Sequence, residues 1–266
     1  MFFPVDKFLS VGIIEIIACR DYNKRMPKRL LTSFLLLIIT ACTPAISPLA
    51  TQPTLLFLRD NSIVSQEWPY GVTTSTLLNL PPGCAVWSLH PAPRGGTLAI
   101  ELSCASGPAV VVLEPDSPEM RPIIDEPGAD SHFLAWDADG QSIYLKIDSL
   151  GNARIVRVDV GSGKLKELPL PATTYDLSLF PSGKMLSSQT AGLGSGAETW
   201  LSNEKGRPLY RLLVEPEHII AFARSSPDGM HLSYILMPDA QTPFPVGALW
   251  LADAEGQNLR LIAEAD

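Results

Sequence analysis

The stretch HFLAWDADGQSIYLKI, residues 132–147, contains two short apolar runs separated by an Asp-Gly turn. Short apolar runs on either side of a glycine that can adopt a positive φ are typical of a β-hairpin. The same pattern occurs three more times, as AVWSLHPAPRGGTLAIEL (85–102), DLSLFPSGKMLSSQ (176–189) and AFARSSPDGMHLSYIL (221–236). The successive turn glycines are 44, 43 and 46 residues apart: Gly96, Gly140, Gly183 and Gly229. The chain therefore contains four related units.

A second turn follows each hairpin and is clearest at Gly163, Gly206 and Gly256. Each unit is therefore predicted to contain four strands, which in about 40 to 50 residues is typical of one blade of a β-propeller. The segment 54–80 adds three further strands. The predicted fold class is all-β, a propeller of about five four-stranded blade-like units that lacks one strand of the first. The ring is then open or imperfect, or the chain is a fragment of a longer propeller.

The turn motifs resemble those of a known family. Trp136 begins the motif W-x-x-D-G, an apolar strand follows it, and SPDG at 226–229 repeats the turn. This form is similar to the TolB-type, WD-repeat-like propeller repeat, although Leu179 and Ser225 stand where that repeat has Trp. The resemblance covers about residues 54–263. It implies a propeller fold, and a fold alone does not determine function.

The N-terminal region has the three parts of a bacterial export signal. Residues 26–41 contain the basic run MPKR, the apolar run LLTSFLLLII and small residues that precede Cys42. The apolar run is much shorter than the about 20 residues that span a bilayer. The tetrad Ile39-Thr40-Ala41-Cys42 resembles a lipobox, which implies that Cys42 is acylated. The alternative is an ordinary secretory signal in which Cys42 is incidental.

This signal determines the predicted domain organisation and location. The chain divides into a misassigned N-terminal extension (1–25), a lipoprotein signal peptide (26–41), a Pro-rich tether (42–53) and the propeller domain (54–266). Met26 then serves as the initiator. The lipid bilayer is the predicted partner of acylated Cys42, because buried acyl chains anchor a protein. The domain is expected at the cell membrane or the outer membrane, facing the periplasm or the exterior.

The composition excludes several classes of protein. Hydrophobic residues make up 46% of the chain and charged residues 18%, which is too apolar for a disordered protein. Lys and Arg number 20 and Asp and Glu number 28, which gives a net charge of -8. Such a chain offers no basic surface to a phosphate backbone, so nucleic acid is not an expected partner.

Cys84 and Cys104 bracket one predicted hairpin and lie symmetrically about Arg94. Residues that are directly opposed on antiparallel strands are close enough to form a disulfide. Because an exported domain meets an oxidising compartment, we predict this disulfide. The alternative is a pair of half-buried thiols.

Motifs for catalysis and for cofactors give no match. GLGSGA at 192–197 has the glycine spacing of a dinucleotide-binding loop, but it continues into a strand and is interpreted as a hairpin loop. The DADG turn at 137–140 lacks the later acidic ligands of a calcium loop. The motifs G-x-S-x-G, H-E-x-x-H and C-x-x-C do not occur in the sequence. No catalytic residue, cofactor or metal is therefore predicted.

Several polar residues fall where a connecting loop enters the innermost predicted strand of a unit. This position forms the rim of a propeller's central channel, where binding loops are common. The candidate ligand rim consists of Asp130, His132, Tyr175, Asp176, Glu217 and His218. The alternative is that these are ordinary solvated loop residues. Together with the lipobox, the repeats and the lack of a catalytic motif, this rim leads to the prediction of a membrane-anchored, non-catalytic protein that binds a protein or a cell-envelope polymer. A lyase or hydrolase that uses a His and a carboxylate is the alternative function.

Overall fold

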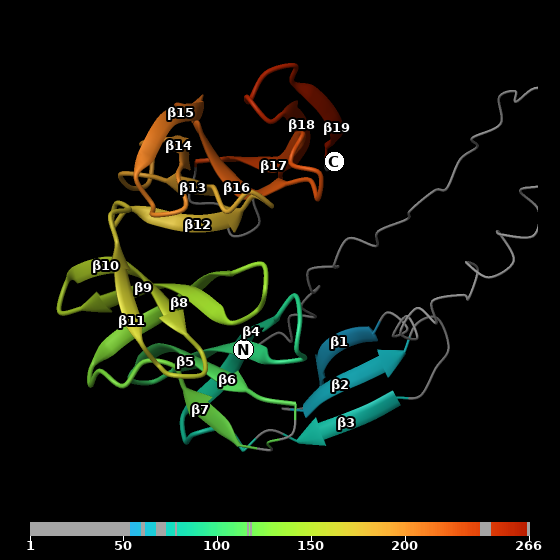
Figure 1. Ribbon diagram of the computed structural model, residues 1–266, viewed down its shortest axis with the longest axis vertical. Helices are drawn as coiled ribbons and strands as arrows, with labels where there is room; N and C mark the ends of the chain where they lie inside the picture. Colours follow the sequence, from blue (N-terminus) through green and yellow to red (C-terminus); the bar gives the residue numbers. More distant parts are fainter. Residues whose placement is uncertain are drawn as a thin grey trace, which may run out of the picture. The chain divides into compact units, whose positions relative to one another are not determined.

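The computed structural model describes residues 54–59, 62–67, 73–77, 79–115, 117, 119–239 and 246–264 (Figure 1). Every helix or strand element in these ranges is a strand, which confirms the all-β prediction. None of the described residues forms a helix that is long and apolar enough to cross a membrane. The predicted extension, signal peptide, tether and Cys42 lie outside the described residues, so they stay predictions.

The chain divides into two compact units, Met1–Leu77 and Leu78–Asp266. The described part of the first unit is one antiparallel sheet of three strands, in the order β1-β2-β3. Its strands are β1 (Thr54–Arg59), β2 (Ser62–Glu67) and β3 (Thr73–Leu77). Ile63 and Val64 of β2 are buried.

The second unit consists of four antiparallel sheets of four strands each. Blade 1 contains β4 (Cys84–Pro91), β5 (Leu98–Cys104), β6 (Gly107–Leu113) and β7 (Met120–Pro122). Blade 2 contains β8 (Ala129–Trp136), β9 (Ser142–Ser149), β10 (Asn152–Asp159) and β11 (Leu165–Leu168). Blade 3 contains β12 (Thr174–Leu179), β13 (Met185–Gln189), β14 (Ala197–Ser202) and β15 (Pro208–Glu215). Blade 4 contains β16 (His218–Ser225), β17 (His231–Pro238), β18 (Ala248–Asp253) and β19 (Arg260–Glu264).

The predicted number of blades was too high. The structure has four four-stranded blades rather than about five, and each corresponds to one of the four repeated units. The three strands of segment 54–80 form a three-stranded sheet in the other compact unit. The segment has strand-forming residues, but it lacks the repeated Asp-Gly or Ser-Gly hairpin that marks the four blades.

The repeated turn is stabilised by its own residues. In blade 2, the Oδ1 atom of Asp137 accepts hydrogen bonds from the backbone N–H groups of Gln141, at 3.0 Å, and Ser142, at 2.9 Å. Gly140 has a φ of 73°, which a residue with a side chain rarely adopts. The Nη2 atom of Arg157 donates to the other oxygen of Asp137 at 2.9 Å. The turn motif therefore has a structural role that needs no ligand.

The hairpin of blade 1 contains the predicted disulfide. Cys84 and Cys104 are directly opposed in the register of β4 and β5, and their Cα atoms are 4.0 Å apart. Their Sγ atoms are bonded. The bridge joins the start of β4 to the end of β5.

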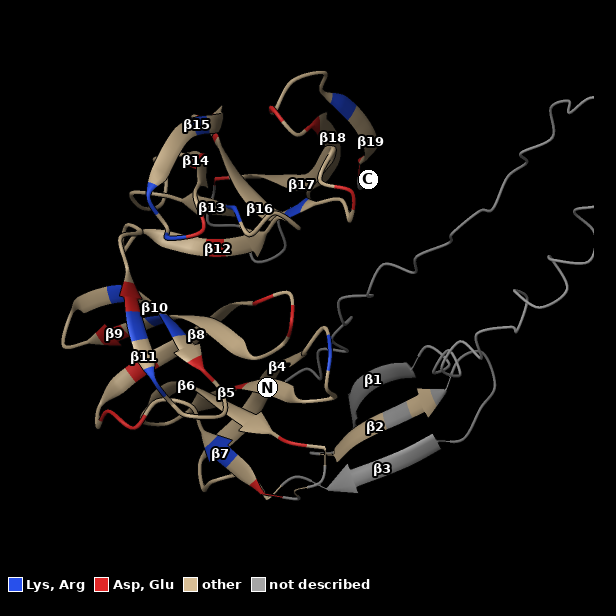
Figure 2. Cartoon of the chain, viewed as in Figure 1, with Lys and Arg blue, Asp and Glu red and all other residues tan. Residues whose placement is uncertain are grey.

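Each pair of consecutive blades packs around its own apolar core. Blades 1 and 2 share buried aliphatic residues such as Val112 and Leu145, and blades 3 and 4 share others such as Leu201 and Ile220. The first strand of blade 3, β12, contacts the first strands of blades 2 and 4, β8 and β16. The first strand of each of these blades is therefore the innermost one, as predicted for a propeller. Charges of both signs lie on the strands β10 and β11 of blade 2 (Figure 2).

Candidate functional site

The predicted rim residues lie at one end of the inner strands. Asp130 and His132 belong to the first half of β8, and Tyr175 and Asp176 to the first half of β12. His218 begins β16, and Glu217 comes directly before it. The structure therefore places these six residues at the same end of three neighbouring inner strands.

One rim residue, His132, belongs to a polar cluster between blades 1 and 2, which we call the Glu101 cluster. Its members are Ser88, His90, Glu101 and His132. The Nδ1 atom of His132 lies 3.0 Å from Oε1 of Glu101, and Ser88 Oγ donates to Oε2 of Glu101 at 3.2 Å. The Nε2 atom of His90 is 2.7 Å from Ser88 Oγ. Both carboxylate oxygens of Glu101 therefore have partners.

The cluster fixes the charge of Glu101. Burial raises the pKa of this carboxyl, but hydrogen bonds with His132, His90 and Ser88 outweigh burial and lower the pKa to about 2. The hydrogen bond to Glu101 raises the pKa of His132 in turn. The side chain of Glu101 is only 12% exposed, whereas that of His132 is 46% exposed. The cluster thus presents an imidazole to solvent and holds it by a buried carboxylate.

An aromatic contact supports the cluster from the side of blade 2. The ring of His90 is stacked on that of Phe133, with 3.8 Å between the ring centroids. The indole Nε1 of Trp136 donates to the backbone oxygen of His90 at 2.8 Å. The repeat Trp therefore ties blade 2 to blade 1 beside the Glu101 cluster.

Tyr175 and Asp176 contact blade 4. The Tyr175 hydroxyl donates to the backbone oxygen of Ile220 at 2.6 Å. The Asp176 carboxylate accepts from the backbone N–H of Ala223, at 3.0 Å, and from Nη1 of Arg224, at 2.9 Å. Burial raises the pKa of the Tyr175 hydroxyl. The polar groups of these two rim residues therefore hold blades 3 and 4 together.

The remaining rim residues are more open to solvent. His218 Nδ1 lies 3.9 Å from an oxygen of Glu215, and its side chain is 42% exposed. Glu217 is exposed, and Asp130 is half-buried beside the β5–β6 turn. A Cβ atom on Gly107, the first residue of β6, would overlap Asp130 Oδ1, so a larger residue there would displace the Asp130 carboxylate. Within the described ranges, no group of three or more His, Cys, Asp and Glu residues could hold a metal ion.

Sequence reasoning missed three members of the Glu101 cluster: Ser88, His90 and Glu101. One signal was present, because Glu101 is the only charged residue in the otherwise apolar strand LAIELSC, and a carboxylate that is buried there needs a partner. Its partner His132 is 31 residues further along the chain. No pattern within a single repeat could predict that contact.

Comparison with known proteins supports the architecture. No protein-family model matches the chain, and no curated protein matches it. Among solved structures, a putative TolB from Agrobacterium tumefaciens has a TM-score of 0.65 and 15% identity, covering 79% of this chain and 76% of that one. TolB from Acinetobacter baumannii has a TM-score of 0.58 and 13% identity, covering 77% of this chain and 49% of that one.

Solved structures of peptidases are similar to the chain as well. Prolyl oligopeptidase B from Galerina marginata has a TM-score of 0.53 and 14% identity, covering 80% of this chain and 32% of that one. The chain thus spans about a third of the length of that peptidase. These likenesses, together with the four blades, define the second unit as a β-propeller. More narrowly, its fold is similar to that of the TolB structures, in agreement with the resemblance that the repeat motifs indicated.

Proposed function

We propose that this protein is a lipid-anchored extracytoplasmic β-propeller that binds a protein or a cell-envelope polymer without catalysing a reaction. The lipobox-like tetrad that ends at Cys42 supports the anchor and the location. The observation that carries the binding role is that the half-exposed side chains of His132 and His218 lie at the same end of the inner strands β8 and β16. Loops and strand ends of this kind form binding surfaces on rigid scaffolds.

Membrane fractionation tests the anchor. The variant Cys42→Ala should move from the membrane pellet to the soluble fraction, because each buried methylene of an acyl chain contributes about 0.8 kcal/mol to anchoring. A variant that stays in the pellet would contradict the lipoprotein proposal. Mass spectrometry of the mature protein should find no peptide from residues 1–25.

Binding by the rim is tested with the full-length protein in detergent. Its targets are purified peptidoglycan sacculi and, after chemical crosslinking, solubilised envelope proteins. The double variant Glu217→Gln/His218→Gln should retain about a tenth of the binding of the unsubstituted protein. Its matched control, Glu204→Gln/His231→Gln, changes the same residue types at the opposite end of the strands and should bind normally. Equal binding by the two double variants would contradict a role for the rim.

A lyase or hydrolase is the second candidate function, and the Glu101 cluster favours it. Glu101 holds Nδ1 of His132, which leaves Nε2 of that ring available as a general base. The carboxylate itself, with a pKa of about 2, would orient the imidazole and would not accept the substrate proton. An enzyme should release soluble fragments from sacculi, and His132→Gln should lower that rate by about 100-fold or more. Intact sacculi after incubation would contradict this second candidate for that polymer.

A further inference from the structure

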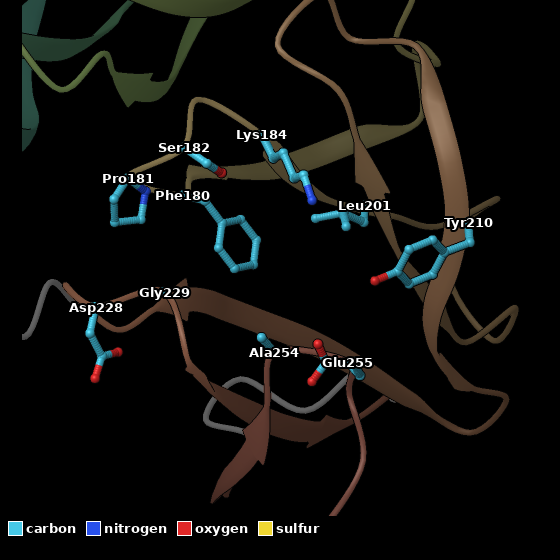
Figure 3. Close-up of a pocket in the computed structure, with 10 residues that line it drawn as sticks. All are labelled: Phe180, Pro181, Ser182, Lys184, Leu201, Tyr210, Asp228, Gly229, Ala254 and Glu255. Atoms are coloured by element: carbon cyan, nitrogen blue, oxygen red, sulfur yellow. The ribbon is translucent and has the colours of Figure 1, made fainter.

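A cavity of about 490 Å³ lies between blades 3 and 4 (Figure 3). It lies at the end of the strands opposite the rim, because the turn after β12 lines it whereas the rim residues lie at the start of β12. Three turns contribute to its walls: β12–β13, β16–β17 and β18–β19. The cavity is thus separate from the predicted rim and from the Glu101 cluster.

The floor of the cavity is formed by apolar side chains of the buried core. Phe180 and Leu201 line it, and both belong to the buried core that blades 3 and 4 share. Their exposed fractions are 7% and 4%. Figure 3 shows the ring of Phe180 projecting into the space between the two blades. A bound group would therefore meet a fixed apolar surface.

The walls carry opposite charges. Lys184 extends from one side of the cavity, and Asp228 and Glu255 lie on the other side (Figure 3). The Tyr210 hydroxyl points inward from β15. Among the described residues, Lys184, Tyr210 and Glu255 have no side-chain hydrogen bond or ion pair. Their polar groups are therefore available to a ligand.

Asp228 contributes a carboxylate that is held by its own turn. Its Oδ1 accepts hydrogen bonds from the Ser226 hydroxyl and the backbone N–H of Met230. These bonds lower the pKa of the carboxyl, the Ser226 bond most strongly. Asp228 is therefore fixed within its turn, and Glu255 is the acidic group that is free to contact a ligand.

We propose that this cavity binds a short zwitterionic peptide. The peptide carboxylate would lie against Lys184, its amino group against Glu255, and one apolar side chain on Phe180. An anionic ligand would leave the two acids unpaired, and a cationic ligand would leave Lys184 unpaired. A neutral sugar would leave both charged walls without a counter-charge. The cavity volume falls in the range of small-molecule sites, so the ligand is limited to a few residues.

Isothermal titration calorimetry on the full-length protein in detergent tests the proposal. The probe is the tripeptide Ala-Phe-Ala with free ends, and the comparison is the same tripeptide acetylated at one end and amidated at the other. The free tripeptide should bind at one site per chain, and the capped one about tenfold more weakly. Lys184→Gln and Glu255→Gln should each raise the Kd about three- to fivefold, as expected for partly exposed ion pairs.

Two matched controls complete the experiment. Lys164→Gln and Glu167→Gln remove exposed charges of the same kinds from blade 2 and should leave the Kd unchanged. Glu217→Gln/His218→Gln should also leave it unchanged, which separates this site from the rim. The absence of binding at about 10 mM tripeptide would overturn the proposal. Equal affinity for the free and capped tripeptides, or Lys184→Gln and Glu255→Gln behaving like the controls, would overturn it as well.

Discussion

The interface between blades 1 and 2 and the interface between blades 3 and 4 have the same topology and different chemistry. At the rim end, the first contains the His132–Glu101 contact, in which both partners can titrate. The second contains the contact between Asp176 and Arg224, whose guanidinium stays charged at all ordinary pH values. The contact across the first interface therefore joins two groups that can titrate, whereas the contact across the second includes a permanent positive charge.

The opposite ends of these interfaces also differ. A Cβ atom on Gly140, in the β8–β9 turn, would lie 2.8 Å from the backbone oxygen of Arg94 in the β4–β5 turn of blade 1. At the equivalent position in blade 4, a Cβ on Gly229 would lie 3.7 Å from Pro181 of blade 3. The first interface is closed where the second holds the cavity. Blades with the same fold can thus differ in how closely their turns pack, and the looser packing between blades 3 and 4 leaves a cavity.

The largest effect is expected from alanine at these two glycines. Both have a φ above 70°, which costs about 1 kcal/mol for alanine. Gly140→Ala also forces a backbone contact apart and should lose about 3 kcal/mol of unfolding free energy in total. Gly229→Ala should lose only about 1 kcal/mol of unfolding free energy, because the nearest atom, on Pro181, is at an ordinary contact distance from the added Cβ. Urea denaturation measures both, and equal losses would mean that the two interfaces are equally closed.

The next largest effect concerns the pH dependence of stability. Glu101 has a pKa of about 2 in the folded protein and an ordinary value of 4.5, so its contribution is complete above pH 4.5 and is lost as the pH falls toward 2. The pKa of His132 is raised above 6.5, so its contribution is complete below pH 6.5 and is lost as the pH rises through the raised value. The pair therefore stabilises the fold most between pH 4.5 and 6.5.

The variant Glu101→Gln should be about 2 kcal/mol less stable than the unsubstituted protein near pH 5.5. The difference should shrink at pH 3 and at pH 8.5. The control is Asp176→Asn at the other interface, whose cost should be the same at pH 5.5 and pH 8.5 because Arg224 does not lose its charge. Parallel pH curves for the two variants would contradict the difference between the interfaces.

The sequence predicted the parts of this comparison that depend on local chemistry. The hairpins, the four repeats and the rim positions follow from the turn residues around Gly140 and its equivalents, because a turn is determined by a few neighbouring residues. The three strands predicted in segment 54–80 are present, but they form a sheet of a separate compact unit rather than part of a fifth blade, because strand-forming residues do not specify which sheet a strand joins. The Glu101–His132 contact and the cavity depend on packing between blades, which no single repeat encodes.

The smallest effect is expected from the charges around the cavity. Lys184→Gln and Glu255→Gln should each change the unfolding free energy by less than about 0.5 kcal/mol, because neither side chain has a polar partner among the described residues. At the equivalent end of blade 2, Arg157 is paired with the buried Asp137 at 2.9 Å. Arg157→Gln should therefore cost about 1 kcal/mol, since it leaves that carboxylate with fewer partners. Thermal unfolding of the three variants measures the contrast. A loss at Lys184 or Glu255 as large as at Arg157 would mean that the cavity charges serve the fold and are not free for a ligand.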